Sequence, residues 1–96
     1  MKHKSILLEA DNLVNGERQK AYGKPENNFK HISEIVSSVL KKKVTAREIV
    51  IMLICTKMSR HIFKPKRDNL TDLAGYAEIL SRIEYQNIDS GREADE

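Results

Sequence analysis

Apolar residues return every three or four positions along most of this chain, which is the spacing of α-helices that bury one face. In the first segment, Ile6, Ala10 and Leu13 share one helical face, and this helix is predicted to start near Ser5. The Gly-Lys-Pro segment at 23–25 interrupts the pattern. Proline disfavours helix at the residue before it and suits the first turn of a new helix, so a helix is predicted on each side of the break.

Two further helices follow from the same spacing. The second is predicted over about residues 25–42, with a broad apolar stripe. Thr45 and Glu48 form a capping-box pattern, in which each side chain satisfies a backbone N–H at a helix start. A third helix is therefore predicted from this point to about Phe63. Because it is apolar nearly all round over residues 49–55, it is expected to be the central, most buried helix.

The fourth helix is predicted over about residues 68–85, beginning at Asp68, a typical N-cap residue. Its inward face is expected to carry Leu70, Leu73, Ala77, Leu80 and Ile83. The sequence shows no strand pattern and no repeat. It predicts an all-α fold, a compact four-helix domain over residues 1–87, followed by a polar, flexible C-terminal tail at 88–96.

A length of 96 residues allows one hydrophobic core and leaves no room for a second domain. The chain is 40% hydrophobic and 32% charged, a balance typical of globular proteins rather than disordered ones. It has no Trp, so its core is expected to be mainly aliphatic. Because one helical unit of this size is only marginally stable, a homo-oligomer is expected.

Charge and apolar run length indicate which partners are not expected. The net charge of +3 is small, and no long basic stripe is present, so nucleic acid is not an expected partner. The longest apolar run, 49–55, is far shorter than the ~20 residues that span a bilayer. The first residues also lack a signal-peptide pattern, so a cytoplasmic protein without membrane contact is expected. Its single cysteine, Cys55, lies in the apolar run and is predicted to be a buried, inert thiol.

A basic helix end faces an acidic helix start across a short loop. Lys57, Arg60 and His61 share one side of the third helix, at the edge of its apolar surface. Asp68 and Asp72 open the next helix. Two interpretations are open: a corner of interhelical salt bridges, or a site where the cations bind an anionic ligand.

The start of the fourth helix offers a second set of polar residues. Asn69, Asp72 and Tyr76 align at i+3 and i+4 spacing, with Asp68 one turn before Asp72. These acids can stabilise the helix start, and carboxylates one turn apart can also hold Mg²⁺. Gly75 in mid-helix costs up to ~1 kcal/mol relative to Ala. Such a glycine indicates close approach by another helix or by a ligand, and close helix packing is the favoured interpretation.

The segment 16–29, GERQKAYGKPENNF, is the third candidate. Glu17 falls on the inward face of the first helix and is a candidate buried acid that needs a cation, with Arg18 on the neighbouring face. Tyr22 and Phe29 flank the turn, and the helix start after it can receive a phosphate near Lys24. The first turn of that helix also carries Asn27 and Asn28. An ordinary turn is the alternative.

These motifs together resemble the signature of a family of small helical proteins common in phages and prophages. The matching residues are ERQ at 17–19, YGKP at 22–25 and NF at 28–29, then K-x-x-R at 57–60 and D-x-x-x-D-L-A-G-Y at 68–76. The resemblance covers about residues 6–83. It implies an all-α fold and a phage setting, and it brings no settled activity.

A wider similarity concerns residues 68–80, DNLTDLAGYAEIL, which are similar to the last motif of the all-α nucleotide pyrophosphohydrolases of the MazG and dimeric dUTPase group. That similarity implies oligomers that hold Mg²⁺ between acids on two helices. It places Asn69 and Asp72 at two acid positions, yet Asn69 is not an acid, and the paired-glutamate motif that precedes it in that group is absent here. Because a Mg²⁺-activated water needs several carboxylates, nucleotide binding is favoured over hydrolysis.

Three hypotheses follow. The leading one is a phage-type protein, without a resident cofactor, that binds a nucleotide-type phosphorylated ligand at a subunit interface and sequesters a host nucleotide signal as a counter-defence. The second is a Mg²⁺-dependent pyrophosphohydrolase that gathers Glu17, Asp68 and Asp72 around the ion. The third is a helical protein–protein interaction module. The candidate ligand-binding residues are Glu17, Arg18, Tyr22, Lys24, Asn28, Phe29, Lys57, Arg60, His61, Asp68, Asp72 and Tyr76.

Overall fold

The computed structural model describes residues 5–16, 19–20 and 23–89, with side chains up to residue 85. Within these residues the chain forms four α-helices and no strand, which confirms the predicted all-α class. The helices are α1 (Ile6–Asn15), α3 (Pro25–Leu40), α4 (Ala46–Phe63) and α5 (Arg67–Asp89). None of these helices combines the length and the apolar character that crossing a bilayer requires.

Local sequence signals define three helix starts as predicted. The Ser5 hydroxyl accepts a hydrogen bond from the Leu7 N–H at 3.2 Å and caps α1. Pro25 occupies the first turn of α3. At α4 the capping box is complete: the Glu48 N–H donates to Thr45 Oγ1 at 3.1 Å, and the Thr45 N–H donates to Glu48 Oε1 at 2.9 Å.

The turn between α3 and α4 is held by a serine side chain. Lys41 adopts a left-handed conformation with φ of 57° and ends α3. The Ser37 hydroxyl then donates to the Val44 carbonyl at 3.0 Å and accepts from the Val44 N–H at 2.8 Å. These two bonds fix the direction in which α4 leaves the turn.

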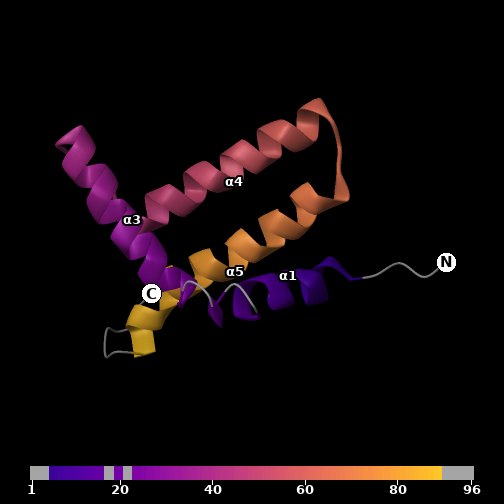
Figure 1. Cartoon of the computed structure of the whole chain (residues 1–96), viewed down its shortest axis with the longest axis horizontal. Coiled ribbons are helices and arrows are strands. Elements are labelled where there is room, and N and C mark those ends of the chain that lie inside the picture. The colour runs from indigo at the N-terminus through magenta and orange to yellow at the C-terminus, as the bar shows by residue number, and fades with distance from the viewer. Residues whose placement is uncertain (1–4, 17–18, 21–22, 90–96) are drawn as a thin grey trace.

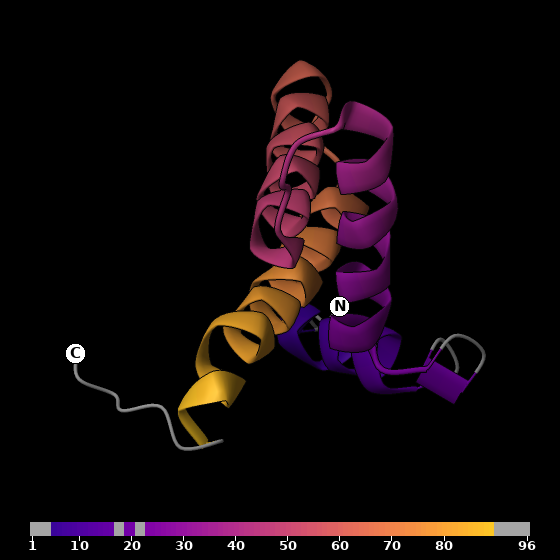
Figure 2. The same ribbon diagram turned by 90° about the vertical axis from the view of Figure 1, so that its left-hand side faces the viewer.

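α5 is the organising helix, because it packs against α1, α3 and α4. Figure 1 shows α4 and α5 as an antiparallel pair joined by the loop 64–66, with α1 along the other side of α5. In Figure 2, α3 stands beside α4, and its first turn meets α1 at the base of the molecule. The start of α3 is thereby brought close to α5.

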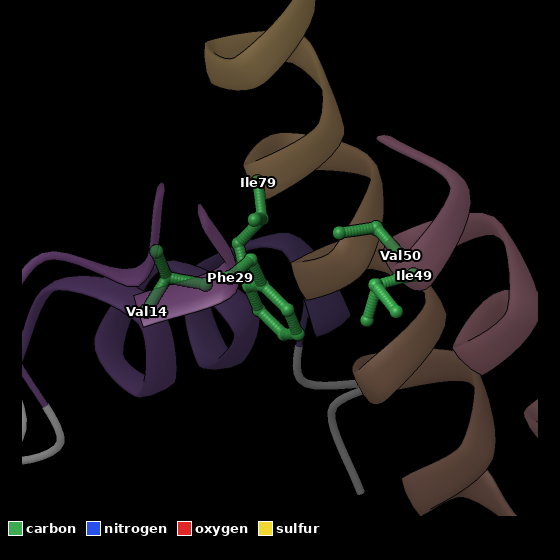
Figure 3. Packing of buried hydrophobic residues seen from close by; sticks show 5 residues of the cluster. All are labelled: Val14, Phe29, Ile49, Val50 and Ile79. Atoms are coloured by element: carbon green, nitrogen blue, oxygen red, sulfur yellow. The ribbon is translucent and has the colours of Figure 1, made fainter. Parts of the chain in front are cut away.

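The core lies where α1, α3, α4 and α5 meet. It consists of Val14, Phe29, Ile49, Val50 and Ile79, with Val50 fully buried. Figure 3 shows the Phe29 ring in the middle of this group. The predicted aliphatic character is therefore correct, apart from one central aromatic ring.

The prediction that α4 is the central, most buried helix is wrong. Its buried residues are Ile49 and Val50, whereas Met52 is 52% exposed and Ile62 is 75% exposed. Cys55, expected to be buried, is exposed as well. The cause is geometric, because α3 and α5 are the described helices that pack extensively on α4, and the face that carries Met52, Cys55 and Ile62 is exposed.

α5 begins at Arg67, one residue before the prediction, and continues to Asp89 rather than ending near Tyr85. The Asn69 N–H donates to the Lys66 carbonyl at 3.1 Å, so the first turn already includes Asp68, which therefore does not cap the helix. The expected inward face is also rotated. Leu70 is 40% exposed and Ala77 is exposed, because α5 faces α1 and α4 at the same time. The buried positions are Asn69, Thr71, Gly75 and Ile79.

Candidate functional site

A hollow of about 280 Å³ lies between α1, the start of α3 and the middle of α5. We call it the enclosed hollow, because it is the less open of the two hollows described below. It combines apolar walls with a few amide, hydroxyl and carboxylate groups, the composition typical of small-molecule sites. The lining residues are Leu13, Val14, Gln19, Gly23, Pro25, Asn28, Phe29, Thr71, Asp72, Gly75, Tyr76 and Ile79.

Polar contacts attach α1 to α5 beside this hollow. Arg67 Nη1 lies 2.6 Å from Glu9 Oε1, and the Thr71 hydroxyl lies 3.4 Å from the same oxygen. Thr71 is only 4% exposed and lines the hollow. The contacts therefore position a wall of the hollow as well as joining two helices.

Arg82, on α5, connects this helix to α1 and α3. Its guanidinium donates to Asn15 Oδ1 of α1 at 2.7 Å and to Glu78 Oε2 of α5 at 2.9 Å. It also lies 3.6 Å from Glu26 Oε1, in the first turn of α3. The side chains of Arg82 and Glu26 are only 17% and 14% exposed, so this ion pair is mostly desolvated. It holds the start of α3, and hence Phe29, against α5.

Gly75 forms part of the lining in mid-helix. A Cβ atom built on Gly75 would meet Val14 Cγ2 at 3.5 Å, an ordinary van der Waals contact. Packing against α1 therefore does not require glycine here, contrary to the favoured interpretation from sequence. The remaining consequence of the missing side chain is a more open hollow.

A second, more open hollow of about 700 Å³ lies between the end of α4 and the start of α5. We call it the basic hollow. Four basic and two acidic side chains line it, so its wall is predominantly cationic. The lining residues are Lys57, Ser59, Arg60, Phe63, Lys64, Lys66, Asp68, Asn69 and Asp72.

Asp72 is common to both hollows. Its Oδ2 atom lies 2.7 Å from Lys57 Nζ, and this pair joins α4 to α5. The Asp72 side chain is 32% exposed and the Lys57 side chain is 20% exposed. Among the described residues, Oδ1 of Asp72 has no hydrogen-bond partner. The carboxylate thus retains one open acceptor on a residue that lines both hollows.

The three basic residues at the end of α4 do not act alike. Lys57 makes the interhelical ion pair, as the salt-bridge interpretation expects. His61 Nδ1 accepts a hydrogen bond from the Lys66 N–H at 3.2 Å and so supports the loop; it lines neither hollow. Arg60 is exposed and makes no ion pair with any described residue. The three side chains therefore do not converge on one point.

The structure brings together part of the predicted ligand set. Asn28, Phe29, Asp72 and Tyr76 line the enclosed hollow, although they come from motifs far apart in the sequence. Asp68 lines only the basic hollow. Lys24 is the exposed residue before α3 and lines neither one. The predicted residues Glu17, Arg18 and Tyr22 lie outside the described residues.

Several lining residues escaped sequence reasoning. Leu13 was predicted only as part of the inward face of the first helix, and the packing of α1 on α5 places it in one cavity with Thr71. Lys64 and Lys66, in the loop between α4 and α5, line the basic hollow together with Asp72. Across the described ranges, no three His, Cys, Asp or Glu side chains gather as metal ligands would.

Comparison with known proteins identifies a family and phage relatives. A family model described as "Domain of unknown function (DUF6378)" matches residues 5–84. The Gene 55 protein of Mycobacterium phage D29 is 37% identical over 91 residues, which cover 88% of this chain and 57% of that protein. The Gene 55 protein of Mycobacterium phage L5 is 28% identical over 82 residues, which cover 83% of this chain and 53% of that protein. The chain thus spans about half the length of these relatives. No solved structure matches it significantly.

Proposed function

The chain belongs to the DUF6378 family, and we propose that it binds a nucleotide-type phosphorylated ligand across its two adjoining hollows. The observation that carries this proposal is the shared wall at Asp72. A nucleotide has a flat aromatic base, with apolar faces and polar edges, at one end and phosphates at the other. A hollow with aromatic and amide groups beside a cationic hollow matches that division.

The enclosed hollow suits the base. Tyr76, which is half-buried, supplies an aromatic surface on which a base can stack. Asn28 and Gln19 supply amide groups, which can pair with the edge of a base. The volume of about 280 Å³ is at the lower end of the range for ligand sites, as expected for part of a ligand rather than the whole.

The basic hollow suits the phosphates. Arg60 has no ion-pair partner among the described residues, and its planar guanidinium can bind two phosphate oxygens at once. Lys64 and Lys66 add positive charge from the adjoining loop. The ion pair of Lys57 with Asp72 favours binding over the pyrophosphohydrolase alternative, because a carboxylate paired with an ammonium group is less available to Mg²⁺.

The phage relatives support a setting for this binding. For a small phage-type protein, we propose that capture of the ligand removes a host nucleotide signal in the host cytoplasm. We also propose that a second copy of the chain covers the outer face of α4, formed by Met52, Cys55 and Ile62. All three are exposed and uncharged.

Calorimetric titration with a nucleotide panel tests the proposal. The panel contains the ribonucleoside and deoxyribonucleoside triphosphates, ADP-ribose and cyclic dinucleotides. Arg60→Ala should weaken binding by a factor of ten to a hundred, because a charge-assisted bond contributes about 1.5–3 kcal/mol. Arg60→Lys should weaken it less, since an ammonium group lacks the planar fork.

Arg47→Ala is the matched control, because Arg47 lies at the opposite end of the same helix and pairs with Glu84 on the surface. It should bind as the wild type does. If no compound in the panel binds, or if Arg60→Ala and Arg47→Ala bind equally well, the proposal is wrong. Thermal melts of each variant show whether the fold is intact.

A further inference from the structure

We infer that Asp72 selects ribonucleotides over deoxyribonucleotides by accepting a hydrogen bond from the sugar 2′-hydroxyl. This inference rests on the proposed nucleotide binding and specifies the ligand class. It follows from where Asp72 lies and from which of its atoms is already engaged.

The position of Asp72 matches the sugar. In every nucleotide the sugar lies between the base and the phosphates. With the base in the enclosed hollow and the phosphates in the basic one, the sugar must lie where the two adjoin. Asp72 is the residue that lines both, so its carboxylate faces the connecting part of the ligand.

The chemistry of the group matches hydroxyl donors. An ionised carboxylate only accepts hydrogen bonds, so it favours a ligand group that donates and disfavours phosphate oxygens. Oδ2 is held by Lys57 Nζ at 2.7 Å, which restricts rotation of the side chain. Oδ1, with no partner among the described residues, can accept from the 2′-hydroxyl that a deoxyribose lacks.

Asp68 provides a matched control. It lines the basic hollow but not the enclosed one, so it borders the proposed phosphate region without facing the sugar. Asp68→Asn removes the same charge from the same helix, one turn earlier. A general electrostatic effect on anion binding would therefore appear in both variants, whereas sugar selection would change only in Asp72→Asn.

The experiment is calorimetric titration of ATP, GTP, CTP and UTP against their 2′-deoxy counterparts. For the tightest-binding base, the wild type and Asp68→Asn should bind the ribonucleotide about ten- to hundredfold more tightly. Asp72→Asn should reduce this ratio to within about threefold, because its amide oxygen is expected to face Lys57 Nζ, which turns the NH2 group, a donor, toward the sugar. If Asp72→Asn does not fold because Lys57 is left unpaired, the double variant Lys57→Gln/Asp72→Asn removes the unpaired positive charge. The same ratio of ribonucleotide to deoxyribonucleotide affinity is then measured in the double variant.

The outcomes separate this inference from the proposed function. Equal binding of ribonucleotide and deoxyribonucleotide by the wild type overturns ribose selection and leaves nucleotide binding intact. A ratio that persists in Asp72→Asn shows that another group reads the sugar and also overturns the inference. If neither set of triphosphates binds, ribose selection fails together with binding of these nucleotides.

Discussion

The two hollows differ in how the chain builds them. The enclosed hollow collects residues from Leu13 to Ile79, most of them on three helices, and polar contacts of Arg67 and Arg82 hold these helices together. The basic hollow uses two neighbouring helix ends and their loop, joined by the ion pair of Lys57 with Asp72. Clustered charge is easy to recognise in a sequence, yet here it lines the more open of the two hollows. The better-defined cavity comes from helix packing among residues with no clustered charge.

Removing the Arg82 guanidinium should have the largest effect on stability. Arg82→Ala leaves the Glu26 carboxylate mostly buried without its cation, so the free energy of unfolding should fall by about 3 kcal/mol. Urea denaturation measures this. Arg47→Ala breaks an ion pair whose arginine side chain is 57% exposed and should cost less than about 1 kcal/mol. Equal losses in the two variants would show that Arg82 does not hold the enclosed hollow together.

Replacing an aromatic wall residue sharpens the distinction between the hollows. Tyr76→Leu keeps apolar bulk but removes the ring, so nucleotide affinity should fall by about five- to a hundredfold, since base stacking contributes about 1–3 kcal/mol. Titration calorimetry is the measurement. Tyr85→Leu, at an exposed position on the same helix, should bind as the wild type does. If Tyr76→Leu binds nucleotide with unchanged affinity, the base does not bind in the enclosed hollow.

Filling the space at Gly75 separates stability from binding. Gly75→Ala should raise the free energy of unfolding by up to ~1 kcal/mol, because Ala is the better helix former and its Cβ meets Val14 at 3.5 Å without a clash. The same methyl group narrows the hollow, so affinity should fall. Thermal melts and titrations of one sample show both effects. A destabilised variant would restore close helix packing as the reason for the glycine.

A substitution on the outer face of α4 should have the smallest effect on the free energy of unfolding and the largest effect on self-association. Ile62→Glu replaces a residue that is 75% exposed, so the monomer should change by no more than about 0.5 kcal/mol. If a second copy covers this face, sedimentation should show an oligomer for the wild type and a monomer for Ile62→Glu. A wild type that sediments as a monomer at high concentration would reject the second copy.

Local signals predicted the helices well because they act over a few residues. The capping box at Thr45 and Glu48 and the break before Pro25 each depend on bonds or sterics within one turn. Predictions of burial failed where they depended on distant contacts. An apolar run such as 49–55 does not state which neighbours cover it, and Cys55 is exposed because α3 and α5 cover only one face of α4.

The candidate site was predicted in part for the same reason. The motifs around Asn28 and Asp72 were recognised separately, and only the crossing of α1 and α3 over α5 brings them to one cavity. His61 shows the opposite error. It shares a helical side with Lys57 and Arg60, yet its ring accepts a backbone bond from Lys66, which helical spacing does not reveal.

Nuclear magnetic resonance can map where a nucleotide binds on this protein and so tests binding across the two hollows most directly. Amide chemical shifts of the 96-residue chain, recorded while ATP or GTP is added, report contacts residue by residue. Nucleotide binding across both hollows predicts saturable shifts at Asn28, Asp72, Gly75 and Tyr76 together with Arg60 and Lys64. Shifts confined to the exposed lysines, with Gly75 and Tyr76 unchanged, would contradict it.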